Sequence, residues 1–304
     1  MENYNTETTT ENNSKSKLLL KIILIIGFLV IVFYFLFSSP VNNKDTTIHV
    51  APSDSLSKIS NKLKSENVIR SPFSLEVLVY IFSGDRHISN GDYLFKKGKS
   101  VLCVAWQLSF GKHGVEPIRV TLKEGFTKED MATLLADKIE GFSKDLFLSD
   151  ERSKEGYLFP DTYFFYPMST TDEILTEITS NFNKRIASVD KDIKSSGKSL
   201  RDIIIMASIL EKEANGKGDS YVISGILWKR IKLGMPLQVD AVKSTYKENG
   251  LPENPISNPG LSSILSAIHP EGSPYLFYLH DDTGQVHYAV DFSQHRSNIA
   301  KYLK

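Results

Sequence analysis

The segment Ile203-Ile204-Ile205-Met206-Ala207-Ser208-Ile209-Leu210-Glu211-Lys212-Glu213 decides the fold of the C-terminal half of this chain. Residues 203–210 carry one hydroxyl and no charge, and a helix that is apolar nearly all round is a buried helix. Three charged residues follow directly. We therefore predict a central buried helix over 199–214 whose glutamates lie where the core meets the surface. Ionisable groups in such a place have pKa values set by the protein rather than by water.

The two glutamates of this helix cannot face the same cleft. Residues two apart on a helix project about 200° from each other. Glu211 continues the stripe of Ile203 and Ala207, whereas Glu213 continues the stripe of Met206, so periodicity leaves the choice open. A part-desolvated glutamate stays protonated near neutral pH and can donate a proton, which is what glycosidic-bond cleavage requires. A solvated helix end is the ordinary alternative.

Composition excludes several classes of function. The 304 residues carry 36 basic and 36 acidic side chains, so no net field favours nucleic acid, and none is expected as a partner. Cys103 is the only cysteine, and its apolar setting predicts a buried, inert thiol. No zinc or iron–sulfur ligand spacing is present, and we expect no metal and no cofactor.

The N-terminal region predicts a membrane anchor. Residues 18–37 are apolar except for Lys21, and a helix of that length crosses the hydrocarbon core of about 30 Å. A cleaved signal peptide is the alternative, but the run is long and no good cleavage site follows. Lysines flank its N-terminal side. The positive-inside rule therefore places residues 1–17 in the cytosol as a polar tail, and the rest outside a cell membrane that the chain crosses once.

A small mixed module is expected after the anchor, within an extracytoplasmic region over 38–140. Residues 47–63 alternate like a strand, turn at Pro52, and then take a helical period; residues 119–135 repeat this plan. A second helix is expected from Ser71-Pro72, and residues 90–95 read as a turn that enters a strand. This strand–helix–helix–strand order resembles a LysM module, which recognises N-acetylglucosamine polymers. A small spacer without sugar affinity is the other interpretation.

A larger α+β domain is predicted over 155–304, after a polar connection at 141–154. Helices are expected at 171–190, 199–214 and 219–233, and a short one near 262–268. A hairpin around Asp281-Asp282-Thr283-Gly284 and a final helix over 293–303 complete the domain. The fold class is α+β, with a transmembrane helix and a LysM-like module before the domain.

Several other polar residues are candidates for this site. Gln238 and Asp240 follow a loop that returns from the 219–233 helix toward the glutamates. Each remaining candidate also has an ordinary structural explanation: Ser208 as a mid-helix hydroxyl, Arg230 as a solvated arginine, Asn258 as turn chemistry, and His295 as a polar residue at a helix start.

Taken together and in this order, the motifs of the chain resemble the YceG-like endolytic murein transglycosylases, the MltG family. The strongest segments are Glu155-Gly156-Tyr157-Leu158-Phe159-Pro160-Asp161-Thr162-Tyr163, Met206 to Ala214, Leu237-Gln238-Val239-Asp240, Pro255 to Gly260 and Phe292 to His295. The resemblance implies that Glu213 is the catalytic glutamate. The chain departs from the pattern in a short 241–250 segment, in Ala241 where proline is common, and in a glycine-rich 214–218 segment. Of the usual tyrosine-containing stretch, only residues 244–246 remain.

The resemblance implies an enzyme that cuts MurNAc–GlcNAc bonds within peptidoglycan strands and leaves 1,6-anhydro-MurNAc ends. Glu213 would act as acid and then as base, and Asp240 would stabilise positive charge. Gln238, Tyr246 and Asn258 are the expected contacts to sugar groups, with Ser208, Glu211, Arg230 and His295 as further candidates. Expected partners are glycan strands, membrane lipid through residues 18–37, and membrane-bound cell-wall synthases (penicillin-binding proteins). The alternatives are a hydrolytic muramidase that uses Asp240 to activate water, and a non-enzymatic peptidoglycan-binding scaffold.

Overall fold

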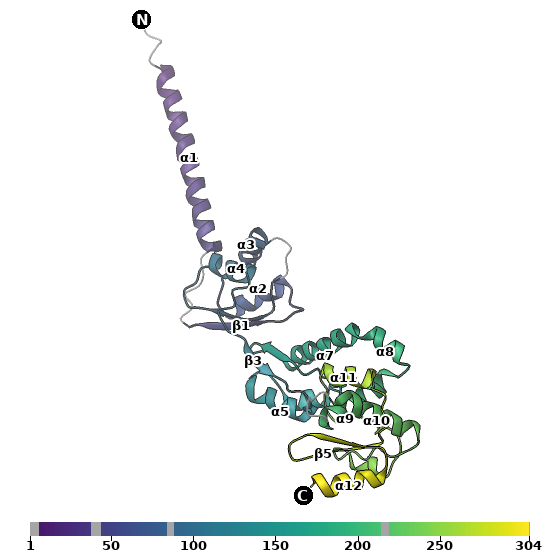
Figure 1. Ribbon diagram of the computed structural model, residues 1–304. Coiled ribbons are helices and arrows are strands. Elements are labelled where there is room, and N and C mark those ends of the chain that lie inside the picture. Colours follow the sequence, from purple (N-terminus) through teal and green to yellow (C-terminus); the bar gives the residue numbers. More distant parts are fainter. Residues whose placement is uncertain (1–5, 38–43, 84–87, 214–218, 304) are drawn as a thin grey trace. The chain divides into compact units, whose positions relative to one another are not determined.

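The computed structural model describes residues 6–37, 44–83, 88–213 and 219–303 (Figure 1). The chain divides into two compact units, Met1–Glu116 and Pro117–Lys304. Each unit has its own buried core.

The first unit begins with the helix α1 (Thr6–Phe37), which contains the predicted membrane span. Its described side chains, at 17–30, 33 and 34, are exposed. Within the described part of the chain, no helix combines the length and the apolar character that a membrane crossing needs.

The predicted strand–helix–helix–strand module follows. Strands β1 (Thr46–Val50) and β2 (Gly91–Phe95) pair antiparallel, with Thr46 opposite Phe95. Between them lie α2 (Leu56–Ser65), which Ser55 caps through Lys58 N–H, and α3 (Pro72–Ser83). Their apolar faces meet in a core that includes Leu63, Leu75 and Tyr93.

A fourth helix of this unit, α4 (Val101–Ser109), was not predicted, because its continuous apolar run over 101–105 is too short to establish a helical period. Its buried residues Val101, Val104, Ala105 and Leu108 follow a helical spacing and join the same core. The prediction of a buried Cys103 is wrong. Its free thiol lies on the opposite face of α4 and is exposed.

The second unit starts earlier than predicted. Strand β3 (Ile118–Thr121) pairs antiparallel with β4 (Thr162–Phe165), and α5 (Lys128–Lys138) begins at a Thr127–Asp130 capping box. Residues 117–140 therefore belong with the C-terminal unit. Residues 141–154, predicted as a mobile connection, instead form α6 (Lys144–Ser149) and place Phe142 and Phe147 in the core.

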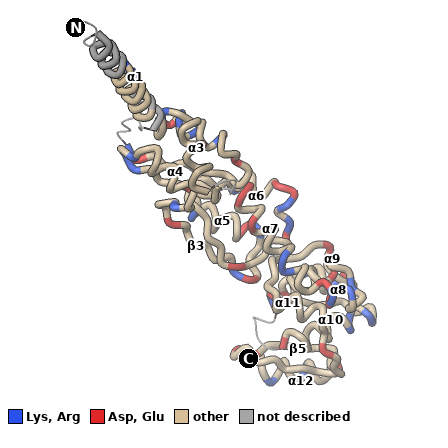
Figure 2. Tube along the Cα trace, turned by 90° about the horizontal axis from the view of Figure 1, so that it is seen from above, with Lys and Arg blue, Asp and Glu red and all other residues tan. Residues whose placement is uncertain are grey.

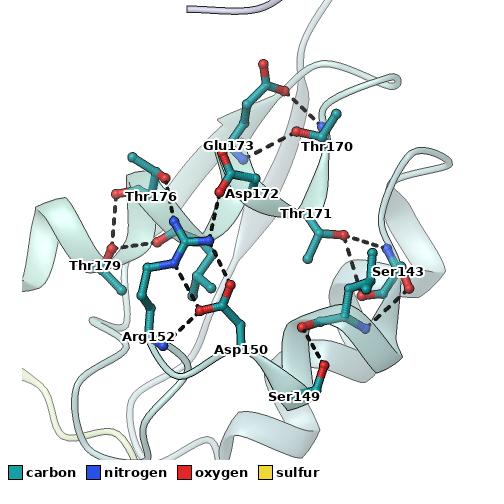
Figure 3. Close-up of polar contacts among 12 residues, drawn as sticks. Ser143, Ser149, Asp150, Arg152, Thr170, Thr171, Asp172, Glu173, Thr176 and Thr179 are labelled. Carbon is teal, nitrogen blue, oxygen red and sulfur yellow. Dashed lines mark hydrogen bonds and ion pairs between the residues drawn. The ribbon is translucent and has the colours of Figure 1, made fainter. Parts of the chain in front are cut away.

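Arg152 ties the loop after α6 to the start of α7 (Thr171–Ser188). Figure 3 shows its guanidinium between two carboxylates, Asp150 and Asp172, each 2.7 Å from Nη2, while Nη1 donates to Thr176 at 3.2 Å. Thr170 and Glu173 cap the same helix end reciprocally. The polar residues that suggested a linker in the sequence thus form ion pairs and hydrogen bonds within an ordered loop.

The buried helix predicted over 199–214 is α9 (Leu200–Glu213), and all of residues 203–210 are buried. It packs against α11 (Leu261–Ile268) and α10 (Ser220–Lys232). A short helix, α8 (Asp190–Ser196), divides the predicted 171–190 helix from α9.

The chain closes with a hairpin and a helix, as predicted. Strands β5 (Phe277–His280) and β6 (Val286–Ala289) pair antiparallel, and α12 (Phe292–Tyr302) follows. In Figure 1 the hairpin and α12, in yellow, lie at one end of the unit, next to the green helices α9 and α10.

Candidate active site

A cleft of about 530 Å³ lies at the C-terminal end of α9, walled by the hairpin and α12. Six of the residues predicted from the sequence line it: Glu213, Arg230, Gln238, Asp240, Tyr246 and His295. They come from α9, α10, the loop after α10 (with the 3₁₀ turn Lys243–Tyr246), and α12. The fold therefore gathers into one cavity residues that are up to 82 positions apart in the sequence (295 minus 213).

Glu213, the last residue of α9, lines this cleft with its carboxyl group. Burial raises the pKa of the Glu213 carboxyl, and the negative charge of Asp240 raises it further. A hydrogen bond from Tyr278 and the backbone N–H groups of Ala241 and Asp240 oppose this shift without reversing it. The carboxyl is thus held toward its protonated form.

Tyr278, on β5, donates its hydroxyl proton to Glu213 Oε2 over 3.1 Å. Burial raises the pKa of this phenol well above its ordinary value, and so does the neighbouring Glu213 charge. Tyr278 therefore stays a neutral hydrogen-bond donor at any physiological pH, and it fixes the orientation of the carboxyl.

Arg230 holds together segments that line the cleft. Its side chain is only 4 % exposed, and its guanidinium donates to Gln238 Oε1, to the Pro236 carbonyl at 2.9 Å and to the Leu276 carbonyl at 3.4 Å. It also lies 5.3 Å from the ring centre of Phe277. Arg230 thus connects α10 to both the Gln238 loop and the hairpin, and the interpretation as a solvated arginine is wrong.

Gln238 is exposed to the cleft and has a left-handed backbone, with φ at 55°. Such a conformation is uncommon outside glycine and is often found at functional sites. It is maintained by a bond from the Gln238 N–H to the Thr245 carbonyl at 3.0 Å. Its side-chain amide keeps its NH₂ group available, because the described residues supply a partner only for its oxygen.

Asp240 and Tyr246 also line the cleft. The Tyr246 hydroxyl donates to Asp240 Oδ1 at 2.6 Å. This bond, together with burial, raises the pKa of Tyr246 to about 12, so the phenol remains protonated.

His295 closes the cleft from α12, with its ring stacked on Phe277 at 5.2 Å. Burial lowers the pKa of His295, and the positive charge of Arg230 lowers it further, so the imidazole is neutral at pH 7. Its Nδ1 has no hydrogen-bond partner among the described residues.

Three predicted residues do not line the cleft. Ser208 is fully buried, where its hydroxyl donates to the Ile205 carbonyl at 2.8 Å and accepts from Ile256 N–H. Glu211 accepts from Gly260 N–H at 2.9 Å. The two glutamates of α9 therefore point to different places, as their spacing requires.

Asn258, predicted as a substrate contact, is fully buried and uses its whole side-chain amide inside the protein. Its oxygen accepts from Gly156 N–H at 2.8 Å and Leu158 N–H at 3.0 Å. Its nitrogen donates to the Phe126 carbonyl at 3.1 Å and to Glu155 at 2.6 Å. No part of it reaches a ligand in this conformation.

Sequence reasoning missed Tyr278 and Phe277, which approach the cleft from the hairpin. The only signal for them was the aromatic composition of the strand at 275–279. In the described parts of the chain, no group of three or more His, Cys, Asp and Glu residues is placed to hold a metal ion. The chemistry that the cleft offers is that of one carboxyl with a raised pKa beside a second acidic group, with amide and hydroxyl groups around them. This is an arrangement for general acid–base catalysis.

Comparison with known proteins finds relatives of this chain. An endolytic murein transglycosylase of Bacillus subtilis (strain 168) is 26 % identical over 305 aligned residues, which cover 84 % of each chain. An endolytic murein transglycosylase of Streptococcus pneumoniae (strain D39) is 28 % identical over 177 residues, or 49 % of this chain and 32 % of that one. The crystal structure of a YceG-like protein from Listeria monocytogenes superposes with a TM-score of 0.54 at 24 % identity, over 84 % of this chain and 99 % of that chain, and shows a shared fold.

The sequence profile of the YceG-like family matches residues 48–243 and 244–301, which include both walls of the cleft and the whole of α9. This chain therefore belongs to the YceG-like family.

Proposed function

We propose that this protein is a lytic transglycosylase that cuts within the glycan strands of peptidoglycan at the cleft of Glu213. The observation that carries the proposal is the place of Glu213, which lies part-buried in a cleft beside the Asp240 carboxylate and the Tyr278 hydroxyl, where burial raises its pKa. The similarity to endolytic murein transglycosylases supports the choice of substrate.

The reaction needs one acid–base group and no external nucleophile. Protonated Glu213 donates its proton to the oxygen that joins N-acetylmuramic acid to N-acetylglucosamine, and the bond from that oxygen to the anomeric carbon breaks. The Glu213 carboxylate then takes the proton of the muramic 6-hydroxyl, whose oxygen attacks the anomeric carbon. A 1,6-anhydro ring forms, no water is consumed, and Glu213 is protonated again for the next cycle.

The surrounding groups suit the charges of this reaction. The Asp240 carboxylate stabilises the oxocarbenium-like transition state. The free NH₂ of Gln238 is available to an acetamido or hydroxyl oxygen of the sugar. Asp240 and Tyr246 are exposed in the cleft, where they can contact further sugar hydroxyls.

We also propose that residues 18–37 anchor the protein in the cell membrane, with residues 1–17 in the cytosol and the catalytic unit outside. The support is the twenty-residue apolar run, whose described side chains are all exposed. The run also includes residues 31, 32 and 35–37, whose side chains lie outside the described set. Cell-wall synthases in the same membrane are the proposed protein partners.

The test compares wild type, Glu213→Gln and Glu211→Gln as full-length protein in detergent, acting on purified peptidoglycan. Released fragments are weighed by mass spectrometry. We expect anhydro-muramic ends, one water lighter than hydrolysis products, from wild type and Glu211→Gln. Loss of the acid proton costs about 10²-fold or more in rate, so Glu213→Gln should release almost nothing. Glu211→Gln is the matched control, because glutamine can still accept from Gly260 N–H.

Other results would select a rival. Hydrated reducing ends that vanish with Asp240→Asn would make the protein a muramidase. A folded wild-type protein that binds sacculi and releases no fragments would make it a peptidoglycan-binding scaffold, and the enzyme proposal would fail.

A further inference from the structure

The helix α4 in the first unit exposes apolar side chains along one whole face. Leu102, Trp106 and Phe110 recur at a spacing of four, and they are 43 %, 47 % and 53 % exposed. The Trp106 and Phe110 rings contact each other, with their centres 5.6 Å apart. Cys103 lies on the same face, and α4 carries no charged residue; its tube in Figure 2 is tan along its length.

The neighbouring helix α3 also exposes large apolar side chains near its C-terminal end. The two helices pack against each other, and Ser83 and Ser109, their last residues, are linked by a hydrogen bond of 3.4 Å. Tyr80 and Ile81 precede this link and are 64 % and 67 % exposed. We call Tyr80, Ile81, Leu102, Trp106 and Phe110 the apolar face of the module. A soluble protein rarely exposes so many large apolar side chains together unless they contact a partner or a membrane.

The chain itself limits what can cover this face. Phe37 ends the proposed membrane span, and Thr46 begins the folded module. Nine residue steps separate them, and a fully extended chain covers at most about 30 Å over that number. A module tethered so closely cannot leave the neighbourhood of the bilayer surface.

The composition of the surface fits a lipid interface better than a protein groove. Trp and Tyr are the residues enriched at the headgroup level of membranes. Three exposed lysines, Lys96, Lys97 and Lys99, precede α4, and Lys112 follows it. Their ammonium groups form no ion pair within the described residues, which leaves them available to anionic headgroups.

We propose that the apolar face of the module docks onto the bilayer in which residues 18–37 are anchored, with Trp106 and Phe110 at the headgroup level and the flanking lysines against anionic lipid. This inference rests on the proposed membrane attachment and is independent of the chemistry at Glu213. Docking would make the module a fixed spacer on the membrane rather than a loosely tethered one.

The test uses the two tryptophans of the chain. Full-length protein is reconstituted into vesicles of phosphatidylcholine and phosphatidylglycerol, with or without bromine on the acyl chains, which quenches nearby tryptophan. Trp228→Phe leaves Trp106 as the only tryptophan, and Trp106→Phe leaves Trp228, in the second unit. For a ring at the interfacial belt we expect about a two-fold loss of Trp106 fluorescence in brominated vesicles, with little change for Trp228.

A second readout needs no substitution at a tryptophan. Cys103, the only cysteine, should react several-fold more slowly with a charged maleimide in vesicles than in detergent. The double variant Ile81→Ser, Phe110→Ser should restore its reactivity, whereas Leu146→Ser, an equally exposed position in the second unit, should not. Both variants should keep glycan cleavage, which separates docking from catalysis.

Flotation of the vesicles distinguishes the two possible failures. Protein that does not float with the lipid overturns the anchor and the docking together. If the protein floats but shows neither quenching of Trp106 nor protection of Cys103, the docking proposal fails and the proposed membrane anchor is retained. Protection that depends on protein density, and not on lipid, would indicate a second copy on this face and would also overturn the bilayer as the occupant.

Discussion

Burial and the Tyr278 hydroxyl shift the pKa of Glu213 in opposite directions. Their balance helps to set the pH at which Glu213 loses its proton. Its bond to the Glu213 carboxylate stabilises the charged form and so lowers the pKa that burial has raised. Proton donation requires the neutral form of Glu213, so activity falls as the pH rises through this pKa.

We predict that Tyr278→Phe moves the alkaline limb of the activity profile to higher pH, by about one unit, because the charged form loses one stabilising hydrogen bond. The profile is measured as rate against pH on peptidoglycan. Tyr275→Phe serves as the control, since Tyr275 stacks on Tyr288 and its hydroxyl has no recorded bond to Glu213. An alkaline limb that moves to lower pH in Tyr278→Phe would contradict this account of the acid.

Asn258 connects its own loop to two others through hydrogen bonds, so its replacement should destabilise the fold. We predict that Asn258→Ala lowers the free energy of unfolding by about 3 kcal/mol or more, because it leaves the buried N–H groups of Gly156 and Leu158 unpaired and removes the bond to Glu155. Urea unfolding of the full chain measures this change. Asn254→Ala, an exposed position on the same loop, should stay within about 0.5 kcal/mol of wild type. Equal stabilities would show that the four bonds contribute little.

These residues also show what a single sequence can reveal at this scale. The two-residue spacing established that Glu211 and Glu213 point apart, but only the family resemblance favoured Glu213. The sequence could not show that Asn258 is buried in the core while Gln238 lies in the cleft, because both are loop residues with an amide side chain. The contacts that distinguish them come from Gly156 and Leu158, about a hundred positions away.

Among the elements, the β5–β6 hairpin has the most direct effect on the site, since it carries Tyr278 and Phe277. Its turn is held by Asp281, which accepts from the Thr283 hydroxyl at 2.6 Å, from two backbone N–H groups, and from His287 at 2.8 Å. These bonds lower the pKa of Asp281; the largest contribution comes from the Thr283 side chain, followed by His287. A lowered carboxyl pKa contributes stability at neutral pH that is lost only as the pH falls through the folded-state value, so the turn remains intact over the physiological range.

We predict that Asp281→Asn loosens this hairpin and reduces activity, because Tyr278 is then held less firmly against Glu213. Hydrogen exchange of the backbone over 276–290 should speed up several-fold, with the module at 44–116 unchanged. Asp282→Asn, at the exposed neighbouring position, is the control. If both variants exchange at the wild-type rate, the Asp281 bonds do not hold the turn.

The elements themselves were largely predictable where the hydrophobic period was long. Helix α9 was placed to within one residue at each end, and the hairpin and α12 were also found. The elements missed were short: α4, α6 and α8 have at most nine residues, too few for a helical period to stand out. The register of β3 with β4 joins segments about forty residues apart, and no local pattern encodes it.

At the scale of the whole molecule, the chain contains separate hydrophobic cores. The core of the module draws only on residues 48–108, whereas the two cores of the second unit use residues 118–288. The sequence placed the boundary within 141–154 because that stretch is polar. The structure places the boundary after Glu116. The polar side chains at 141–154 instead cap helices and form the ion pairs of Arg152 within the second unit.

Separate cores should respond separately to mutation. We predict that Leu63→Ala, which empties a fully buried position in the module, lowers the stability of that unit by about 2–5 kcal/mol. Hydrogen exchange of α9 should not change in this variant. Leu210→Ala, equally buried in the second unit, should give the reverse pattern. A single cooperative loss of protection over both units, in either variant, would show that they fold as one body.

The place of Glu213 at the very end of α9 has a further consequence. The aligned peptide units of a helix carry about half a negative charge at its C-terminus, and a carboxylate there is disfavoured by about 0.3–1 kcal/mol when salt is low. The helix dipole of α9 therefore adds to burial in favouring the neutral acid. Because ions screen this dipole, a rise in ionic strength would weaken its effect and let the carboxyl ionise at a lower pH. The same helix that builds the core would in this way make the pH range over which Glu213 can donate a proton depend on ionic strength.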